Sequence, residues 1–159
     1  MDFYLRNLVV NNKIEKLKEY GIDNDTISLL DSMQRNLFHY IEQFDTFKYL
    51  YNVFKENINH IIKQDKYGMI PFHFYIEKNC MKIVNYLLKE NIDKPTIFLI
   101  KDNNEKGLLH YSQSIEMSSL LLKYYNSNDL NIYHQLKGDG SMVFHCCIIN
   151  KNLSLFKYY

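Results

Sequence analysis

Four of the six histidines in this 159-residue chain recur at a regular interval, and a row of imidazoles is what a metal site or an acid–base array requires. They are His39, His73, His110 and His145, separated by 34, 37 and 35 residues. Equivalent positions of stacked repeats stand about one repeat apart, which is too far for one ion to bind them together. We therefore predict no metal site, and a structural role in which each imidazole bonds the backbone of adjoining turns.

The cysteines provide no route to catalysis either. Cys146 follows His145 directly, but neighbours on a helix point about 100° apart, so the pair predicts no Cys–His nucleophile. The three cysteines, Cys80, Cys146 and Cys147, form neither a disulfide framework nor a zinc ligand set, because two are adjacent and none has a C-x-x-C spacing. The sequence contains neither of the glycine-rich phosphate-binding motifs, G-x-x-x-x-G-K-S/T and G-x-G-x-x-G. We expect no enzymatic activity and no cofactor.

Each recurring histidine ends a nine-residue segment that is repeated along the chain. The clearest copy is 65–73, DKYGMIPFH, and the others are 31–39, DSMQRNLFH, 102–110, DNNEKGLLH, and 137–145, KGDGSMVFH. Asp65 can bond its own backbone two residues on, and Gly68 permits a positive φ, so this segment predicts a tight turn. Pro71 suits the first position of the helix that follows.

Two short helices are expected after each turn. In the clearest copy, Phe72, Tyr75 and Ile76 share one face of the first helix, Asn79 ends it, and a second begins near Met81. Neither helix is long enough to be stable alone in water, so the apolar faces must pack on neighbouring units.

The other parts of the chain fit the same frame. Phe38 and Ile41 mark the first helix of the copy at 31–39, and Leu109 begins that of the copy at 102–110. Upstream of all copies, Gly21 is expected to end the second helix of an N-terminal unit. Residues 92–101, which include Pro95, are expected to be the longest linker, and His60 is expected in a loop between repeats.

A repeat of this kind resembles the ankyrin family, whose unit of about 33 residues carries T-P-L-H after a turn. The resemblance covers roughly residues 3–159 and is strongest at Gly68, Pro71 and His73. A tetratricopeptide array, the alternative, lacks a turn before each histidine. The chain departs from the family where bulky pairs such as Tyr75 and Ile76 replace small residues, which predicts helices pushed apart. The family's Thr is replaced in every copy, by Asn36, Ile70, Gly107 and Met142.

The pattern and the resemblance together predict an all-α fold, an ankyrin-repeat solenoid of stacked turn–helix–helix units. Residues 1–159 are expected to form a single ankyrin-repeat domain. A degenerate N-terminal unit would occupy 1–30, and the repeats would occupy about 31–64, 65–101, 102–136 and 137–159. The last repeat is incomplete, so we expect further repeats or self-association at the C-terminal end.

Composition narrows the class of partner. The net charge is +1 and no basic run exceeds two residues, so we expect no nucleic-acid binding. The longest apolar stretches are too short to span a bilayer, so we expect no membrane insertion. No secretory signal is visible at the N-terminus, and the cysteine usage favours a reducing compartment. We therefore expect an intracellular protein, in the cytoplasm or the nucleus.

The resemblance implies a non-catalytic protein–protein interaction module. In the ankyrin family the turn tips and the surface of the first helices form the binding face, and we expect a protein partner of unidentified nature there. Tyr67, at a turn tip, should be exposed and can anchor a partner. The alternative is that the chain is the targeting or substrate-binding portion of a larger enzyme or adaptor. The residues expected to bind are Arg35, Lys66, Tyr67, Met69, Glu77, Lys78, Asn103, Asn104 and Lys106.

Overall fold

The structure, a computed structural model, describes residues 1–57, 59–90 and 94–127. Over these residues the chain is helical and contains no β-strand, which confirms the all-α prediction. The elements, with η for a 3₁₀ helix, are α1 (Phe3–Val10), α2 (Ile14–Tyr20), α3 (Asn24–Ser28), η1 (Leu37–Tyr40), α4 (Phe44–Phe54), α5 (Asn59–Ile62), α6 (Pro71–Glu77), α7 (Met81–Lys89), α8 (Lys94–Leu99), η2 (Leu108–Tyr111) and α9 (Ile115–Ser127).

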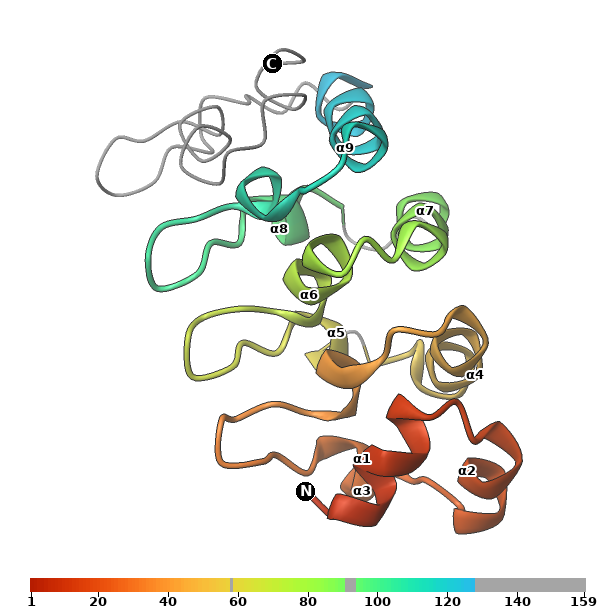
Figure 1. The fold of residues 1–159 in the computed structure, drawn as a ribbon. Helices are drawn as coiled ribbons and strands as arrows, with labels where there is room; N and C mark the ends of the chain where they lie inside the picture. Colours follow the sequence, from red (N-terminus) through yellow and green to blue (C-terminus); the bar gives the residue numbers. More distant parts are fainter. Residues whose placement is uncertain (58, 91–93, 128–159) are drawn as a thin grey trace.

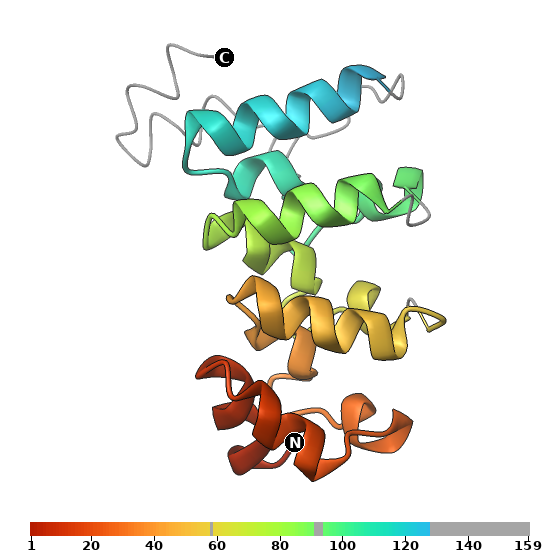
Figure 2. The same cartoon turned by 90° about the vertical axis from the view of Figure 1, so that its right-hand side faces the viewer.

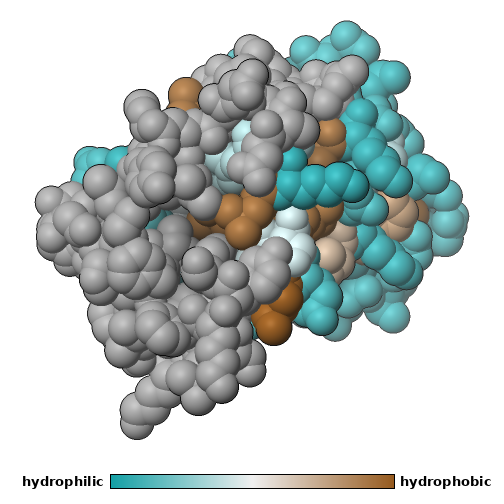
Figure 3. All heavy atoms as spheres, turned by 90° about the horizontal axis from the view of Figure 1, so that it is seen from above, coloured by the Kyte–Doolittle hydropathy of each residue, from teal (hydrophilic) through white to brown (hydrophobic). Residues whose placement is uncertain are grey.

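The helices stack in two columns. In one column α2 packs on α4, α4 on α7, and α7 on α9; in the other α1 packs on η1, η1 on α6, and α6 on η2 (Figures 1 and 2). The turns project from the second column, on the side away from the first (Figure 1). Seen along the stack, polar residues cover the outer side of the first column, and apolar residues lie nearer the middle (Figure 3).

Aromatic rings fill the space between the two columns. Phe47 of α4 lies 6.3 Å from Phe38 of η1 and 5.6 Å from Tyr75 of α6, measured between ring centroids. Tyr75 is fully buried, and its hydroxyl donates a hydrogen bond of 2.8 Å to the carbonyl of Phe38. The ring and the hydroxyl of this bulky residue therefore both bind the preceding unit.

Among the three turn-bearing units that the structure describes, only one has an α-helix as its first helix. Pro71 opens α6, whereas the equivalent segments η1 and η2 are single 3₁₀ turns of four residues. The prediction that Ile41 belongs to the first helix is wrong, because its backbone is extended, with φ −81° and ψ 122°. The pre-set φ of proline favours the α-helix at 71, and no proline stands at Leu37 or Leu108.

Two segments that were expected to be loops contain helices. The expected linker 92–101 includes α8, where Pro95 lies in the first turn and is tolerated because the N–H groups there have no helical partner. Phe98 of α8 is buried 5.7 Å from Phe72 and 4.2 Å from Tyr124, between ring centroids. His60, also expected in a loop, lies on α5, buried against Phe38 and Phe54. Tertiary packing of these apolar residues overrides the loop signals.

Several other local predictions are confirmed. Gly21 ends α2 in the left-handed conformation, with φ 69°, and Asn79 separates α6 from α7 with φ 54°. No helix of the described residues is long and apolar enough to cross a bilayer. The expected fourth repeat, with His145, Cys146 and Cys147, lies outside the residues that the structure describes. The further repeats or self-association expected at its C-terminal end therefore stay a prediction.

Candidate functional site

The turn at 65–69 is held by the side chain that begins it. One carboxylate oxygen of Asp65, Oδ1, accepts the backbone N–H of Tyr67 at 2.8 Å and that of Met69 at 2.9 Å. Gly68 occupies the left-handed region with φ 79°. The structure thus confirms both chemical features that the sequence predicts for this turn.

The turns at 31–35 and 102–106 repeat this geometry without glycine. Asp31 and Asp102 each accept two backbone N–H bonds at 2.8–2.9 Å. Gln34 and Glu105 take the position of Gly68, each with φ 60°. A non-glycine residue in this region costs about 1–2 kcal/mol, which the two hydrogen bonds to the carboxylate help to offset.

The turns are bonded to one another in a continuous row. The N–H of Lys66 donates to the carbonyl of Met33 at 2.9 Å, and the N–H of Asn103 donates to that of Tyr67 at 2.8 Å. The Asn103 side chain adds a bond of 3.0 Å to the carbonyl of Lys66. A Cβ atom on Gly68 would lie 2.5 Å from Asn103 Oδ1 and 2.7 Å from Asn103 N, so the third turn sits directly on this glycine.

In the first and third turns a tyrosine binds the remaining oxygen of the aspartate. The hydroxyl of Tyr40 donates to Asp31 Oδ2, and that of Tyr111 donates to Asp102 Oδ2 at 2.5 Å. Burial alone would raise the pKa of both carboxyls, but the tyrosine hydroxyls and the turn backbones outweigh it and hold each pKa below its usual value. Burial and the carboxylate raise the pKa of Tyr40 and Tyr111 in return.

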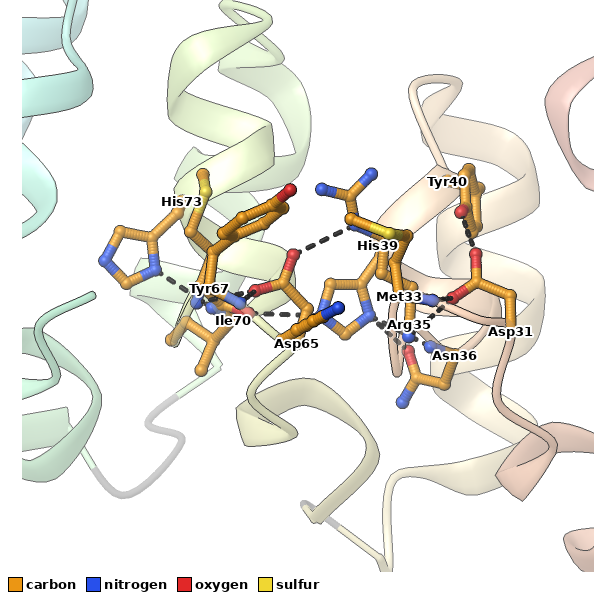
Figure 4. Close-up of polar contacts among 12 residues, drawn as sticks. Asp31, Met33, Arg35, Asn36, His39, Tyr40, Asp65, Tyr67, Ile70 and His73 are labelled. Carbon is orange, nitrogen blue, oxygen red and sulfur yellow. Dashed lines mark hydrogen bonds and ion pairs between the residues drawn. The ribbon is translucent and has the colours of Figure 1, made fainter. Parts of the chain in front are cut away.

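In the second turn an arginine takes the place of the tyrosine. The residue equivalent to Tyr40 is Phe74, which has no hydroxyl, and Asp65 Oδ2 instead accepts Arg35 Nε at 2.9 Å (Figure 4). The Arg35 guanidinium carbon lies 4.6 Å from the Phe74 ring centroid, a cation–π contact. The side chain of Asp65 is fully buried and that of Arg35 is 22% exposed. Arg35, predicted to bind a partner, therefore links the first turn-bearing unit to the second.

Two of the four recurring histidines, His39 and His73, bond the turn backbones, as the sequence predicts. His39 Nδ1 lies 3.2 Å from the N–H nitrogen of Asn36, and its Nε2 lies 3.3 Å from the carbonyl oxygen of Met69 in the next turn (Figure 4). His73 Nδ1 accepts the N–H of Ile70 at 3.1 Å. Burial lowers the pKa of His39 and of His73 to about 4, so both rings are neutral at pH 7.

The structure divides the predicted binding residues into two groups. Tyr67 is 50% exposed at a turn tip, and the exposure expected of it is confirmed. Glu77 and Lys78 lie instead where α6 ends. Among the remaining predicted residues, Lys66, Asn103 and Asn104 are exposed, whereas Met69 and Lys106 are half-buried.

A hollow of about 350 Å³ lies beside this second group. Residues of α1, η1 and α6 line it, and Arg35 enters it from the first turn. No sequence pattern pointed to Val10, Tyr40, Ile41 and Glu42 as site residues, because only tertiary packing brings them to α6. The hollow is lined by Val10, Arg35, His39, Tyr40, Ile41, Glu42, Phe74, Glu77 and Lys78.

Over the part of the chain that the structure describes, no three His, Cys, Asp or Glu side chains come together as a metal site would require. Burial, and then the nearby Glu42 carboxylate, raises the pKa of Cys80 to about 11, so this cysteine is a protonated thiol at neutral pH. What remains is a row of fixed turns, an exposed tyrosine and a charged hollow.

Comparison of the sequence with protein-family models and with curated proteins finds no match.

Proposed function

We propose that the chain is an ankyrin-repeat protein that serves as a non-catalytic protein–protein interaction module. Its units would begin near residues 31, 65, 102 and 137. The resemblance of the repeated segments supports this assignment, and so do the stacked columns and the bonded row of turns. The partner would be a protein of the same compartment, the cytoplasm or the nucleus.

The observation that carries the proposal is the exposure of Tyr67 on a fixed turn. Asp65 accepts the N–H of Tyr67 itself and that of Met69, and the N–H of Asn103 donates to the Tyr67 carbonyl. A tyrosine held in this way offers a large amphipathic surface and loses little entropy when a partner covers it. Exposed aromatic anchors with these properties carry much of the energy of protein interfaces.

The proposed binding face extends from the turn tips to the end of α6. Met69 lies beside Tyr67 on the second turn, and Lys78 ends the face at the C-cap of α6. Arg35, which was also predicted to bind a partner, holds the turn at the edge of the hollow, because its guanidinium is bound to Asp65. The face comprises Lys66, Tyr67, Met69, Glu77, Lys78, Asn103, Asn104 and Lys106.

The test begins with affinity capture of partners from the native cell and measurement of their dissociation constants with purified protein. Replacing Tyr67 by Ala should cost about 1–2 kcal/mol, or roughly tenfold in affinity. The matched control is Val53→Ala, on α4, because Val53 is also 50% exposed but lies in the other column. Full affinity in a folded variant with Tyr67, Met69 and Lys78 all changed to Ala would refute this binding face.

A further inference from the structure

The hollow between α1, η1 and α6 has the size and walls of a side-chain pocket. Its volume of about 350 Å³ lies at the lower end of the range of ligand pockets. Val10 and Ile41 supply aliphatic surface, and the rings of Tyr40 and Phe74 supply aromatic surface. Walls of this composition suit a long apolar stem.

Two of these walls are fixed before any ligand arrives. Arg35 is bound by Asp65 Oδ2 at 2.9 Å and lies on the Phe74 ring. The Tyr40 hydroxyl is bound to Asp31. Side chains that are already held in place lose little conformational entropy when a ligand enters the pocket that they form.

The charge in the hollow is negative on balance. Asp65 offsets Arg35, and His39 is neutral because burial lowers its pKa to about 4. Two carboxylates, Glu42 and Glu77, and one ammonium, Lys78, then remain. None of these three takes part in an ion pair within the described residues.

Both carboxylates lie close enough to a neighbouring group to raise its pKa. After burial, Glu42 is the next cause that raises the pKa of Cys80. Glu77 adds to the raised pKa of Tyr111, after burial and Asp102. Glu77 is half-buried, so covering it with a partner that offers no cation would leave its charge desolvated and unpaired.

We propose that this hollow receives one basic side chain, a lysine or an arginine, of the protein partner; this rests on the function proposed above. The aliphatic stem would lie against Val10 and Ile41, and the cationic head would lie between Glu42 and Glu77. An acidic side chain would meet two carboxylates, and an apolar one would leave both of them unpaired.

The test uses blocked amino acids as probes, so it does not depend on finding the partner. The ¹⁵N-labelled protein is titrated with the N-acetyl amides of arginine, lysine, norleucine and glutamate, and amide shifts are followed by NMR. The arginine and lysine probes should shift residues 40–42 and 74–78, and the norleucine and glutamate probes should not. Glu77→Gln should weaken the binding of the arginine and lysine probes by about threefold or more. The control is Glu19→Gln, an exposed carboxylate on α2, which should change nothing.

Each outcome bears on one proposal only. If the basic probes leave the hollow unshifted, or if the glutamate probe binds equally well, the basic-side-chain proposal is wrong while the proposed function stands. If the basic probes bind but the partner is insensitive to Tyr67→Ala, the pocket is real and the binding face is misplaced. Glu77→Gln should also weaken the binding of an identified partner. A folded Glu77→Gln variant with undiminished affinity for that partner would contradict the basic-side-chain proposal.

Discussion

The second turn and its two neighbours hold the aspartate that begins each turn by different means. Tyr40 and Tyr111 bind Asp31 and Asp102 from within their own unit. Asp65 is bound by Arg35, which comes from the preceding unit. The difference shows how a repeat can lose one hydroxyl and keep its turn, because a neighbour supplies the missing donor.

The replacement of a tyrosine donor by Arg35 changes which units are coupled. The Tyr–Asp bonds stabilise a single unit, whereas the Arg35–Asp65 pair crosses from the first turn-bearing unit to the second. That junction also has the bond from the Tyr75 hydroxyl to the Phe38 carbonyl. We infer that these two units unfold together, because in repeat proteins the interfaces between neighbours set cooperativity.

The largest expected effect concerns Gly68, because among the three turns that the structure describes only the second has a glycine at this position. Gly68→Ala should lower the free energy of unfolding by about 3 kcal/mol or more, since it adds a clash with Asn103 to a strained φ. The matched control is Gly21→Ala, where φ is 69° and no atom lies within 4 Å of the added Cβ. The control should cost only about 1 kcal/mol in urea denaturation. Equal losses would show that the turns do not stack as described.

A nearly equal effect should follow acidification, through His73 of the second unit. Its pKa is about 4 in the folded chain and about 6.5 in an unfolded one, so the unfolded chain binds more protons between these values. The contribution of His73 to stability should therefore be full above pH 6.5 and fall by about 3 kcal/mol on the way to pH 4. His39, whose pKa is also about 4, should add a loss of similar size over the same range. The lowered pKa values of Asp31 and Asp102 extend the loss below pH 4. An NMR titration of the His73 ring that gives a pKa of 6.5 or higher would contradict this account.

The comparison of turns is tested most closely by exchanging the two kinds of donor. Arg35→Met should cost about 2 kcal/mol, because it leaves the buried Asp65 carboxylate without its cation while the two backbone bonds remain. Adding Phe74→Tyr to that variant should recover part of the loss, since position 74 then resembles Tyr40 and Tyr111. A double-mutant cycle in urea measures the recovery. Additive effects of the two changes would mean that Arg35 does not replace the hydroxyl.

The sequence was sufficient to predict the turns and the second helices. Asp65 and Gly68 specify their turn through local chemistry, and the helix expected near Met81 is α7, which begins there. It was not sufficient for η1, where Ile41 continues the helical pattern but extends the backbone. Periodicity reports which side chains are buried, and Ile41 is indeed buried, but it does not distinguish one 3₁₀ turn from a longer helix.

The candidate site was predictable in its exposed part only. Tyr67 stands in a turn motif, so its exposure follows from the sequence. The pairing of Arg35 with Asp65 does not, because it depends on Phe74, a substitution whose meaning appears only when three turns are compared. Val10 joins the hollow from α1, more than thirty residues upstream of Glu42, and no local pattern encodes that approach.

The central claim, that the turn face around Tyr67 binds a protein partner, is tested most directly by site-specific photo-crosslinking. A photoreactive phenylalanine analogue is placed at position 67 and, in a second protein, at position 53 on α4, which is equally exposed. Both are irradiated in the native cell, and the adducts are identified by mass spectrometry. We expect one defined partner to be crosslinked at position 67 and not at position 53. Crosslinking at position 53 alone, or the same adducts at both positions, would contradict the claim.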